Sequence, residues 1–324
     1  MPGGCFNVKK RILVVGYSQS GQLRDVLRSI TGPLEESPNV EVIYADIQPK
    51  EEYPFPWPFL RFFDAFPECV HLDPPPIQPV TFDPDAHYDL IILGYQVWFL
   101  SPSLPITGFL KSDAGRRVLA GKPVMTVVAC RNMWLNAQEA VKQMIADAGG
   151  HHVDHAALVD TGSALATFIT TPRWVLTGRR DGFWGLPRAG LTQEQIRSSA
   201  RFGRAILHAL AQGDLREQAP LLQGLAAAKV DARLIPSERI GYRSFFIWGK
   251  LLRAVGRQGQ WRRKPVLVFY IAFLLTLIVT VVPVTMVIRT LTRPLVRSRL
   301  AREQVALEGP SGSDNSRMQE FHHD

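Results

Sequence analysis

The sequence is poor in cysteine. Its 324 residues contain only three, Cys5, Cys69 and Cys130, an odd number at wide spacing. This pattern predicts neither a disulfide framework nor a CxxC metal site, and it favours a reducing compartment. The N-terminal residues hold no long apolar run ahead of the first predicted strand, so we expect no signal peptide.

Internal repeats are also lacking, and the 25 glycines and 24 prolines are not periodic, which excludes a collagen-like chain. Positive charge is scarce in one half only. Residues 1–160 hold 13 Lys and Arg against 18 Asp and Glu, whereas residues 161–324 hold 24 against 11. The basic half indicates an anionic partner. Since no nucleic-acid-reading motif accompanies it, we expect lipid headgroups and no nucleic acid.

One uncharged run stands out in the basic half. Residues 265–288 contain 24 residues without a charge. As a helix this run would be roughly 36 Å long at about 1.5 Å per residue, enough to cross a bilayer core of about 30 Å. A buried core helix is the alternative, but such helices are rarely so long and so uniformly apolar. We therefore expect one transmembrane helix, preceded by a basic juxtamembrane region, residues 213–264, and followed by a polar tail, residues 289–324, of which residues 304–324 are expected to be disordered. The mixed aromatic and basic residues 238–264 fit either an interfacial stretch or an ordinary amphipathic helix packed on the domain.

Before this region, short apolar runs alternate with helical patterns. Strands are predicted at residues 11–16, 40–46, 88–94, 122–129 and 153–160. Helices are predicted at residues 22–30, 136–148 and 192–212, the last with a Thr192–Gln195 capping box. This alternation predicts an α/β fold with a doubly wound, five-stranded parallel sheet in residues 1–212. Ligands of such sheets bind beyond the carboxyl ends of the strands.

The loop after the first strand is rich in hydroxyl groups and leads directly into a helix. It contains neither a GxGxxG nor a GxxxxGK[ST] motif, so it indicates neither a dinucleotide fold nor a nucleoside-triphosphate loop. Free N–H groups at the helix start can hold a phosphate monoester, with Ser18 and Ser20 as further donors and Gly21 allowing close approach. A serine N-cap before a tight turn is an equally simple explanation. The candidate phosphate-binding residues are Ser18, Gln19, Ser20, Gly21, Gln22 and Leu23.

Two aromatic loops follow the third and fourth predicted strands. An aromatic side chain at a strand end can stack on a planar ring, and backbone amides beside it can bond the ring's polar edge. The alternatives are a hydrophobic loop that plugs the core and a surface loop with one buried tryptophan. The candidate residues are Gln96, Val97, Trp98, Phe99 and Ser101 in one loop and Cys130, Arg131, Asn132 and Trp134 in the other.

Together these loops resemble the flavodoxin superfamily. The stretch VVGYSQSGQL is similar to its phosphate loop, with Leu23 where the family usually has Thr, and DLIILGYQVWFLSPSLPITGFL is similar to its flavin loop. The resemblance covers about residues 10–160 and implies FMN held by residues 18–23, 96–101 and 130–134. Because we expect no export signal and the first domain would need FMN, we expect this domain to lie in the cytoplasm.

A narrower resemblance comes from two further stretches. Residues 53–66 hold seven aromatic residues in fourteen, and residues 173–188 mix Trp with Arg. They could form an apolar pocket with a cationic rim for a lipophilic substrate, or belong to the core or the bilayer. With YSQSGQL, QVWFLSPSLP and the apolar run, they resemble the dialkylresorcinol condensing enzymes. The resemblance implies FMN-dependent aromatisation of a dialkyl cyclohexanedione, beside a ketosynthase partner.

Two other functions fit the same residues: an NAD(P)H:quinone reductase and a membrane-tethered electron carrier or scaffold without a substrate. No catalytic base is identified. His71, His87 and His155 are candidates by residue type alone, and the histidines around residue 153 do not predict a metal site. Cys130 is better explained as a small buried thiol than as a reactive group.

Overall fold

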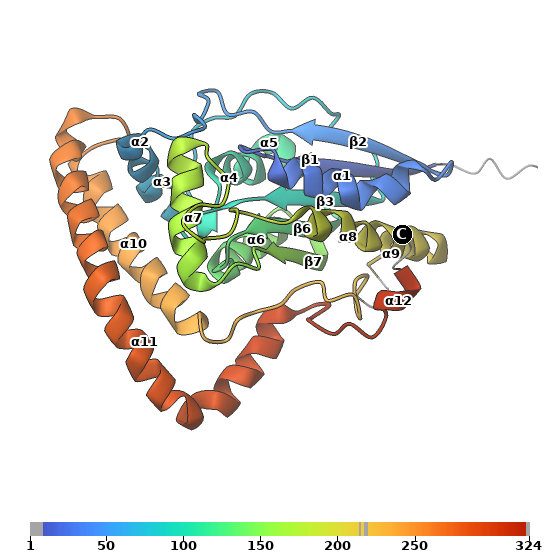
Figure 1. The fold of residues 1–324 in the computed structure, drawn as a ribbon. Helices are drawn as coiled ribbons and strands as arrows, with labels where there is room; N and C mark the ends of the chain where they lie inside the picture. Colours follow the sequence, from blue (N-terminus) through green and yellow to red (C-terminus); the bar gives the residue numbers. More distant parts are fainter. Residues whose placement is uncertain (1–8, 214, 217–219, 322–324) are drawn as a thin grey trace, which may run out of the picture.

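The computed structural model describes residues 9–213, 215–216 and 220–321. A five-stranded sheet forms its centre, with strands in the order β2-β1-β3-β6-β7 (Figure 1). All neighbouring strands are parallel. The strands are β1 (Lys10–Gly16), β2 (Val40–Asp46), β3 (Leu90–Tyr95), β6 (Pro123–Cys130) and β7 (His151–Val159). This order is that of the flavodoxin-like fold, with its switch point between β1 and β3, and it confirms the predicted fold class.

Helices cover both faces of the sheet. On one face α1 (Gln22–Glu35), α8 (Gln193–Ser198) and α9 (Ala200–Gln212) pack in one apolar core cluster. On the other face a second cluster joins the sheet to α4 (Leu104–Lys111), α5 (Asp113–Leu119) and α6 (Leu135–Asp147). Successive residues of β1 alternate between the two clusters: Ile12 and Val14 face the first, and Leu13 and Val15 face the second.

The helix predicted over residues 192–212 is two helices, separated at Ser199. Its capping box is confirmed: the Thr192 hydroxyl accepts from the Gln195 N–H at 3.1 Å, and Gln195 Oε1 accepts from the Thr192 N–H at 3.0 Å. Within α9, Gly203 permits very close contact with α1. A Cβ atom added there would lie 1.8 Å from the carbonyl oxygen of Ile30, so any side chain would push the two helices apart.

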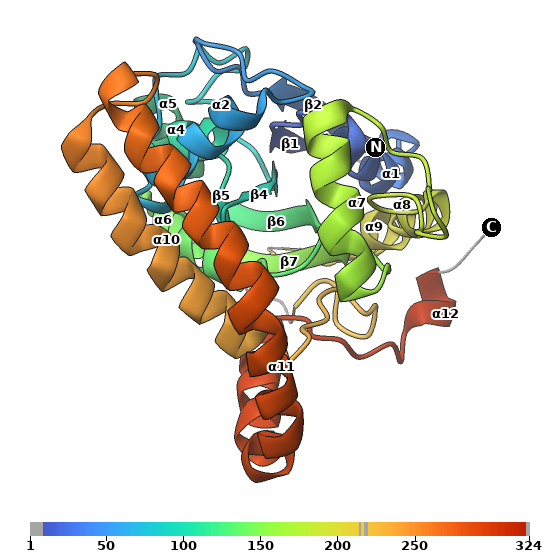
Figure 2. The same cartoon turned by 60° about the vertical axis from the view of Figure 1, so that its left-hand side comes forward.

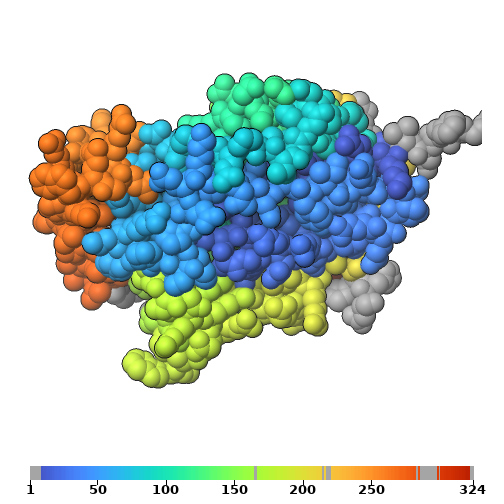
Figure 3. Space-filling view, turned by 90° about the horizontal axis from the view of Figure 1, so that it is seen from above, coloured from blue at the N-terminus to red at the C-terminus, as the bar shows by residue number. Residues whose placement is uncertain are grey.

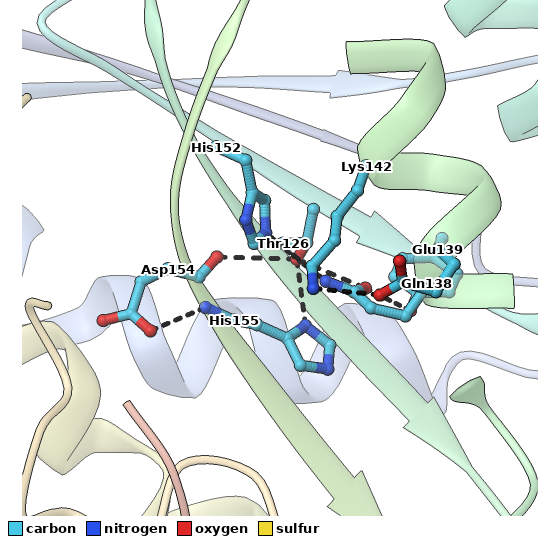
Figure 4. A network of polar contacts seen from close by, with 8 residues as sticks. Thr126, Gln138, Glu139, Lys142, His152, Asp154 and His155 are labelled. Atoms are coloured by element: carbon cyan, nitrogen blue, oxygen red, sulfur yellow. Dashed lines mark hydrogen bonds and ion pairs between the residues drawn. The ribbon is translucent and has the colours of Figure 1, made fainter. Parts of the chain in front are cut away.

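A polar network lies inside the sheet domain, between β6, β7 and α6 (Figure 4). The Thr126 hydroxyl lies 2.9 Å from both His152 Nε2 and His155 Nδ1, and Gln138 Nε2 donates to it at 3.1 Å. The Tyr95 hydroxyl donates to Gln138 Oε1 at 2.6 Å. Burial lowers the pKa of His152 to about 4 and holds the pKa of His155 well below its usual value, so both rings are neutral at pH 7.

The C-terminal part forms a long helical pair at one end of the molecule (Figures 2 and 3). It consists of α10 (Ile235–Val255), the short helix η1 (Trp261–Arg263) and α11 (Lys264–Glu308). The pair packs on the aromatic segment, residues 53–70, which carries α2 (Phe59–Asp64) and α3 (Phe66–Val70). Among the described residues, one helical stretch is long and apolar enough to cross a membrane, Trp261–Val281.

Of two expectations for this region, the apolar helix is confirmed with a later end, and the disordered tail is wrong. The helix predicted at residues 265–288 continues as α11 to Glu308. The tail, expected to be disordered, instead returns to the sheet domain, where α12 (Met318–Phe321) packs beside α9 (Figure 1). Polar composition misleads here because the tail is held by specific hydrogen bonds rather than by an apolar face: the Ser311 hydroxyl donates to Asp154 at 2.6 Å.

Candidate functional site

The β1–α1 loop leaves the start of α1 open. Gly21 is the N-cap, with φ of 84°, and no side chain caps the helix. A Cβ atom added to Gly21 would have no heavy atom within 4 Å. Ser18 Oγ accepts from the Arg24 N–H at 3.2 Å, and across the described chain the Ser20 hydroxyl has no protein partner. The free N–H groups at the start of α1 and the Ser20 hydroxyl are donors of the kind that bind anions.

Three candidates in this loop are directed elsewhere. Gln19 Oε1 accepts from the Trp57 indole at 2.9 Å, and its Nε2 donates to the Pro54 carbonyl at 3.0 Å, which ties the loop to the aromatic segment. The Gln22 side chain is turned toward Leu191. Leu23 lies wholly in the core, so a phosphate could be bound only by its backbone N–H. The side chains of Gln22 and Leu23 are therefore wrong predictions, because each is drawn into packing with a distant segment.

The loop after β3 folds into a small antiparallel hairpin of β4 (Val97–Trp98) and β5 (Ser101–Pro102). Phe99 and Leu100 form its turn, with φ of 50° and 61°. Two-residue hairpins with positive φ at both turn positions normally use Asn or Gly, so this turn holds backbone strain. Without such a turn residue, the sequence contained no signal for the hairpin.

Trp98 lies at the centre of a cluster of rings. Its ring centroid is 6.0 Å from that of Tyr17, 5.0 Å from Tyr53 and 5.4 Å from Trp57, all in edge contacts. The prediction for Phe99 is wrong: its ring points away from the other loops and packs 4.8 Å from that of Phe62 in the aromatic segment. The positive φ angle turns its side chain to that side.

Buried polar atoms without a partner gather in the same loop. In the described part of the chain, Gln96 Oε1 and the hydroxyls of Ser101 and Ser103 are buried and unbonded. Buried polar groups are nearly always satisfied in proteins, so such a group needs an explanation such as a bound ligand or water. Val97 is half-buried against the core cluster of α4–α6 and contributes backbone only.

The loop after β6 divides between surface and core. Arg131 lies over the Phe168 ring at 5.2 Å and donates to Asn132 Oδ1 at 3.3 Å. Trp134 is buried, with its ring 4.9 Å from that of His155, as the alternative of one buried tryptophan expects. It also lines a cavity beside Asn132, so it stays a candidate of the site. Burial raises the pKa of the Cys130 thiol, which is therefore protonated and unreactive at neutral pH.

A helix that sequence reasoning missed stands across this edge of the sheet. It is α7 (Ala164–Thr177), which carries Phe168, and the chain after it returns to Gly190 (Figure 2). Asp160, at the end of β7, holds that return: its Oδ2 accepts from the Gly190 N–H at 2.8 Å. Trp174 on α7 contacts Phe55 at 6.2 Å between centroids, so the two unusual stretches do meet. Trp184 is 95% exposed and takes no part.

Two cavities adjoin these loops. One of about 140 Å³ is lined by the phosphate-loop residues 17–19, the end of β2 and Tyr53. The other, of about 620 Å³, lies between Asn132 and the segment 226–238. The first cavity lies beside Ser18, Gln19 and Arg24; Ser20 and Gly21 do not line it, whereas Asp46 and Glu52 do.

The histidine candidates lie elsewhere. His155 is buried in the network of Figure 4. His87 lies beside Asp89 and Lys122, at the amino ends of the strands. His71 contacts the Phe246 carbonyl on α10 at 3.1 Å. Only His155 touches one of the three loops, through its ring contact with the buried Trp134. Within the described residues no group of three His, Cys, Asp or Glu side chains could hold a metal.

No protein-family model and no curated protein sequence matches this chain. Solved structures with a similar fold include a flavoprotein in complex with FMN from Lactobacillus acidophilus NCFM, 19% identical over 46% of this chain and 93% of that one, with a TM-score of 0.37. An archaeal flavodoxin is 13% identical over 62% and 99%, with a TM-score of 0.33. An azoreductase from Bacillus anthracis str. Sterne is 14% identical over 59% and 99%, with a TM-score of 0.30. At these identities the likeness concerns the fold.

Proposed function

We propose that this protein is a membrane-attached, FMN-dependent oxidoreductase with a lipophilic cyclic dione or quinone as its substrate. The observation that carries the proposal is the open start of α1, with the unbonded Ser20 hydroxyl and a left-handed Gly21, next to a loop with buried, unbonded polar atoms at Gln96, Ser101 and Ser103. A phosphate monoester fits the first, and the polar edge of a planar ring fits the second.

The residues at this edge of the sheet fit the phosphate and the ring system of FMN. Ser18, Ser20 and the first N–H groups of α1 would hold the phosphate. Gln96 and the strained hairpin bearing Trp98 would hold the ring from one side, with Arg131 and Asn132 on the other. When bound, FMN supplies transfer of electrons or hydride. Burial raises the pKa of Tyr17 and Tyr53, so their hydroxyls stay protonated and can donate a hydrogen bond beside this loop, but do not serve as a base.

A lipophilic substrate is supported by the aromatic segment. Ring contacts run from Trp98 to Trp57, from Trp57 to Phe62 and from Phe62 to Phe99, at 5.4, 5.7 and 4.8 Å. They continue through Phe99 and Phe66 to Tyr270 on α11, at 5.8 and 4.7 Å. A continuous apolar path thus joins the candidate flavin loop to the apolar helices, as a substrate delivered from lipid would need.

Within this class we propose, from the sequence resemblance, the aromatisation of a dialkyl cyclohexanedione, with a ketosynthase partner supplying the substrate. The reaction removes two hydrogens, a hydride and a proton, and the acceptor of the electrons is the flavin. In a quinone reductase, NAD(P)H would reduce the flavin, and the reduced flavin would pass its electrons to the quinone. An electron carrier would exchange electrons with a protein and convert no organic substrate.

The cofactor is tested by the visible spectrum of detergent-purified protein and by titration with FMN. We expect flavin absorbance that is lost in Ser20→Asp, because a carboxylate repels the phosphate, and kept in Ser20→Asn, which has nearly the same shape and no charge. Well-folded protein that stays colourless in excess FMN would refute the proposal. Loss in both variants would mean that residue 20 acts through shape and not through charge.

The substrate is tested with the flavin-loaded protein. Bleaching of the flavin spectrum by a dialkyl cyclohexane-1,3-dione under anaerobic conditions, with formation of the resorcinol, is the expected result. Steady NAD(P)H consumption with a quinone and no bleaching by the dione would instead establish the reductase. Electron exchange with a reductase, with neither compound converted, would establish the carrier.

A further inference from the structure

Both ends of α11 are fixed to the same body. At its start, the Arg263 guanidinium is fully buried and binds the Glu68 carboxylate through two bonds, at 2.7 and 2.8 Å. At its end, Glu308 is buried and its Oε1 accepts from the Val230 N–H at 2.9 Å. Figure 1 shows the last part of α11 turning back toward the sheet domain.

The tail after α11 continues this attachment. The Ser311 hydroxyl donates to Asp154 of β7, and the same carboxylate accepts from the Leu222 N–H at 2.7 Å. The carbonyls of Gly312 and Asp314 accept from the backbone N–H groups of residues 228 and 226, at 3.1 and 2.6 Å. Phe321 then enters the core cluster of α1 and α9. These hydrogen bonds between the tail, β7 and residues 222–228 form only if the tail and the sheet domain lie in one compartment.

The outward side of the helical pair is apolar and uncovered. Only 17% of the most apolar stretch of α11 is buried. Ile247, Phe269 and Val279 are 67%, 64% and 73% exposed. Exposed cations, Arg257, Arg262 and Lys264, adjoin this surface where α10 turns into α11. Apolar side chains beside cations fit the headgroup and acyl boundary of an anionic bilayer.

We propose that the chain is monotopic: α10 and α11 dock on one leaflet of an anionic membrane, and α11 does not cross it. A crossing at residues 265–288 would place about 30 Å of hydrocarbon between the sheet domain and residues 308–321. Every bond of the tail to β7 and to the 222–230 segment would then be broken. The inference sharpens the membrane attachment proposed above and is independent of FMN.

The test compares two exposed positions, one in the sheet domain and one in the tail. Glu36→Cys and Asn315→Cys are made separately in a Cys5→Ser background, and that background alone reports labelling of the remaining cysteines. Sealed right-side-out and inside-out membrane vesicles are treated with a membrane-impermeant maleimide, before and after detergent. We expect both positions to react in the same vesicle orientation and to be protected in the other.

Reaction of the two positions in opposite orientations would establish a crossing and overturn the proposal. Failure of the protein to sediment with membranes would overturn both the docking and the attachment, while leaving FMN binding untouched. A second measurement concerns the lipid. Purified protein should co-sediment with vesicles of phosphatidylcholine and phosphatidylglycerol at least several-fold better than with phosphatidylcholine alone, and high salt should reduce the difference. Equal binding of the protein to both kinds of vesicle would show that its cations do not contribute to membrane binding, and docking on an anionic leaflet would be wrong.

Discussion

The sheet domain and the helical pair α10–α11 are built by opposite rules. In the sheet domain the strands bury Ile, Leu and Val, and the buried polar side chains around Thr126 are uncharged. In the helical pair a charged guanidinium, Arg263, is fully buried, while Phe269 and Val279 are largely exposed. Buried apolar side chains without buried charges are typical of a domain that is surrounded by water. The arrangement in the helical pair suits a surface that faces lipid on one side and a folded domain on the other.

The junction between the two regions explains why a charge is buried there. Arg263 is held by Glu68 and by Asp64, whose carboxylate oxygen lies 2.9 Å from its Nε. Both acids belong to the aromatic segment, which also contacts Trp98. The ion pairs therefore fix the helical pair to the candidate site with one geometry, a specificity that apolar contacts alone supply less well.

The largest expected effect comes from breaking this junction. Arg263→Ala leaves two carboxylates in a buried site without their cation, which is expected to lower the free energy of unfolding by about 3–5 kcal/mol. Arg262→Ala, at the exposed neighbour, is the control and should change it by less than about 0.5 kcal/mol. Chemical denaturation in detergent measures both. Equal effects of the two variants would show that the buried ion pair does not hold the helices.

A second pair of substitutions sharpens the contrast between buried and exposed rings. Phe66→Ala removes a fully buried ring in contact with α11 and is expected to lower the free energy of unfolding by about 3 kcal/mol or more. Phe269→Ala removes an exposed ring, so stability in detergent should hardly change, whereas binding to anionic vesicles should weaken. A fall in stability as large as that of Phe66→Ala would mean that protein covers Phe269.

The neutral network of the sheet domain gives a pH dependence. The pKa of His152 is lowered to about 4 on folding, against about 6.5 when unfolded. A lowered folded pKa contributes stability that is present above pH 6.5 and lost as the pH falls toward 4, by about 1.4 kcal/mol per pH unit. Urea denaturation at pH 7, 6 and 5 should show that His152→Gln loses less stability on acidification than the unmodified protein. Parallel losses would contradict the assignment.

The smallest effect concerns Gly21. Its left-handed φ of 84° disfavours other residues, but an added Cβ meets nothing. Gly21→Ala should therefore lower the free energy of unfolding by only about 1 kcal/mol, and Gly21→Asn by less, since Asn tolerates this conformation. Thermal unfolding ranks the two. A reversed order would mean that crowding, and not backbone conformation, limits this position.

Local pattern sufficed for much of the sheet domain. The strand at Val40–Asp46 has the predicted bounds, and the others differ from the prediction by at most two residues at either end. Pattern also placed Ser20, Gly21 and Trp98 at the carboxyl edge, because parallel strands carry their following loops to one side. Pattern did not predict the side-chain directions of Phe99 and Trp134. That of Phe99 depends on a positive φ in the hairpin, and that of Trp134 depends on packing against His155.

By itself, the sequence determined the alternation of strands and helices, the hydroxyl-rich loop before α1 and the apolar length of α11, because each is a property of consecutive residues. Tertiary structure alone decided that the tail returns to β7, that Gln22 turns away from the phosphate loop, and that α7 crosses the strand ends. These depend on single hydrogen bonds between residues far apart in the chain, such as Ser311 to Asp154 and Gly190 to Asp160. Such a bond needs only one polar residue at each end. It therefore leaves no repeating pattern in the sequence from which it could be predicted.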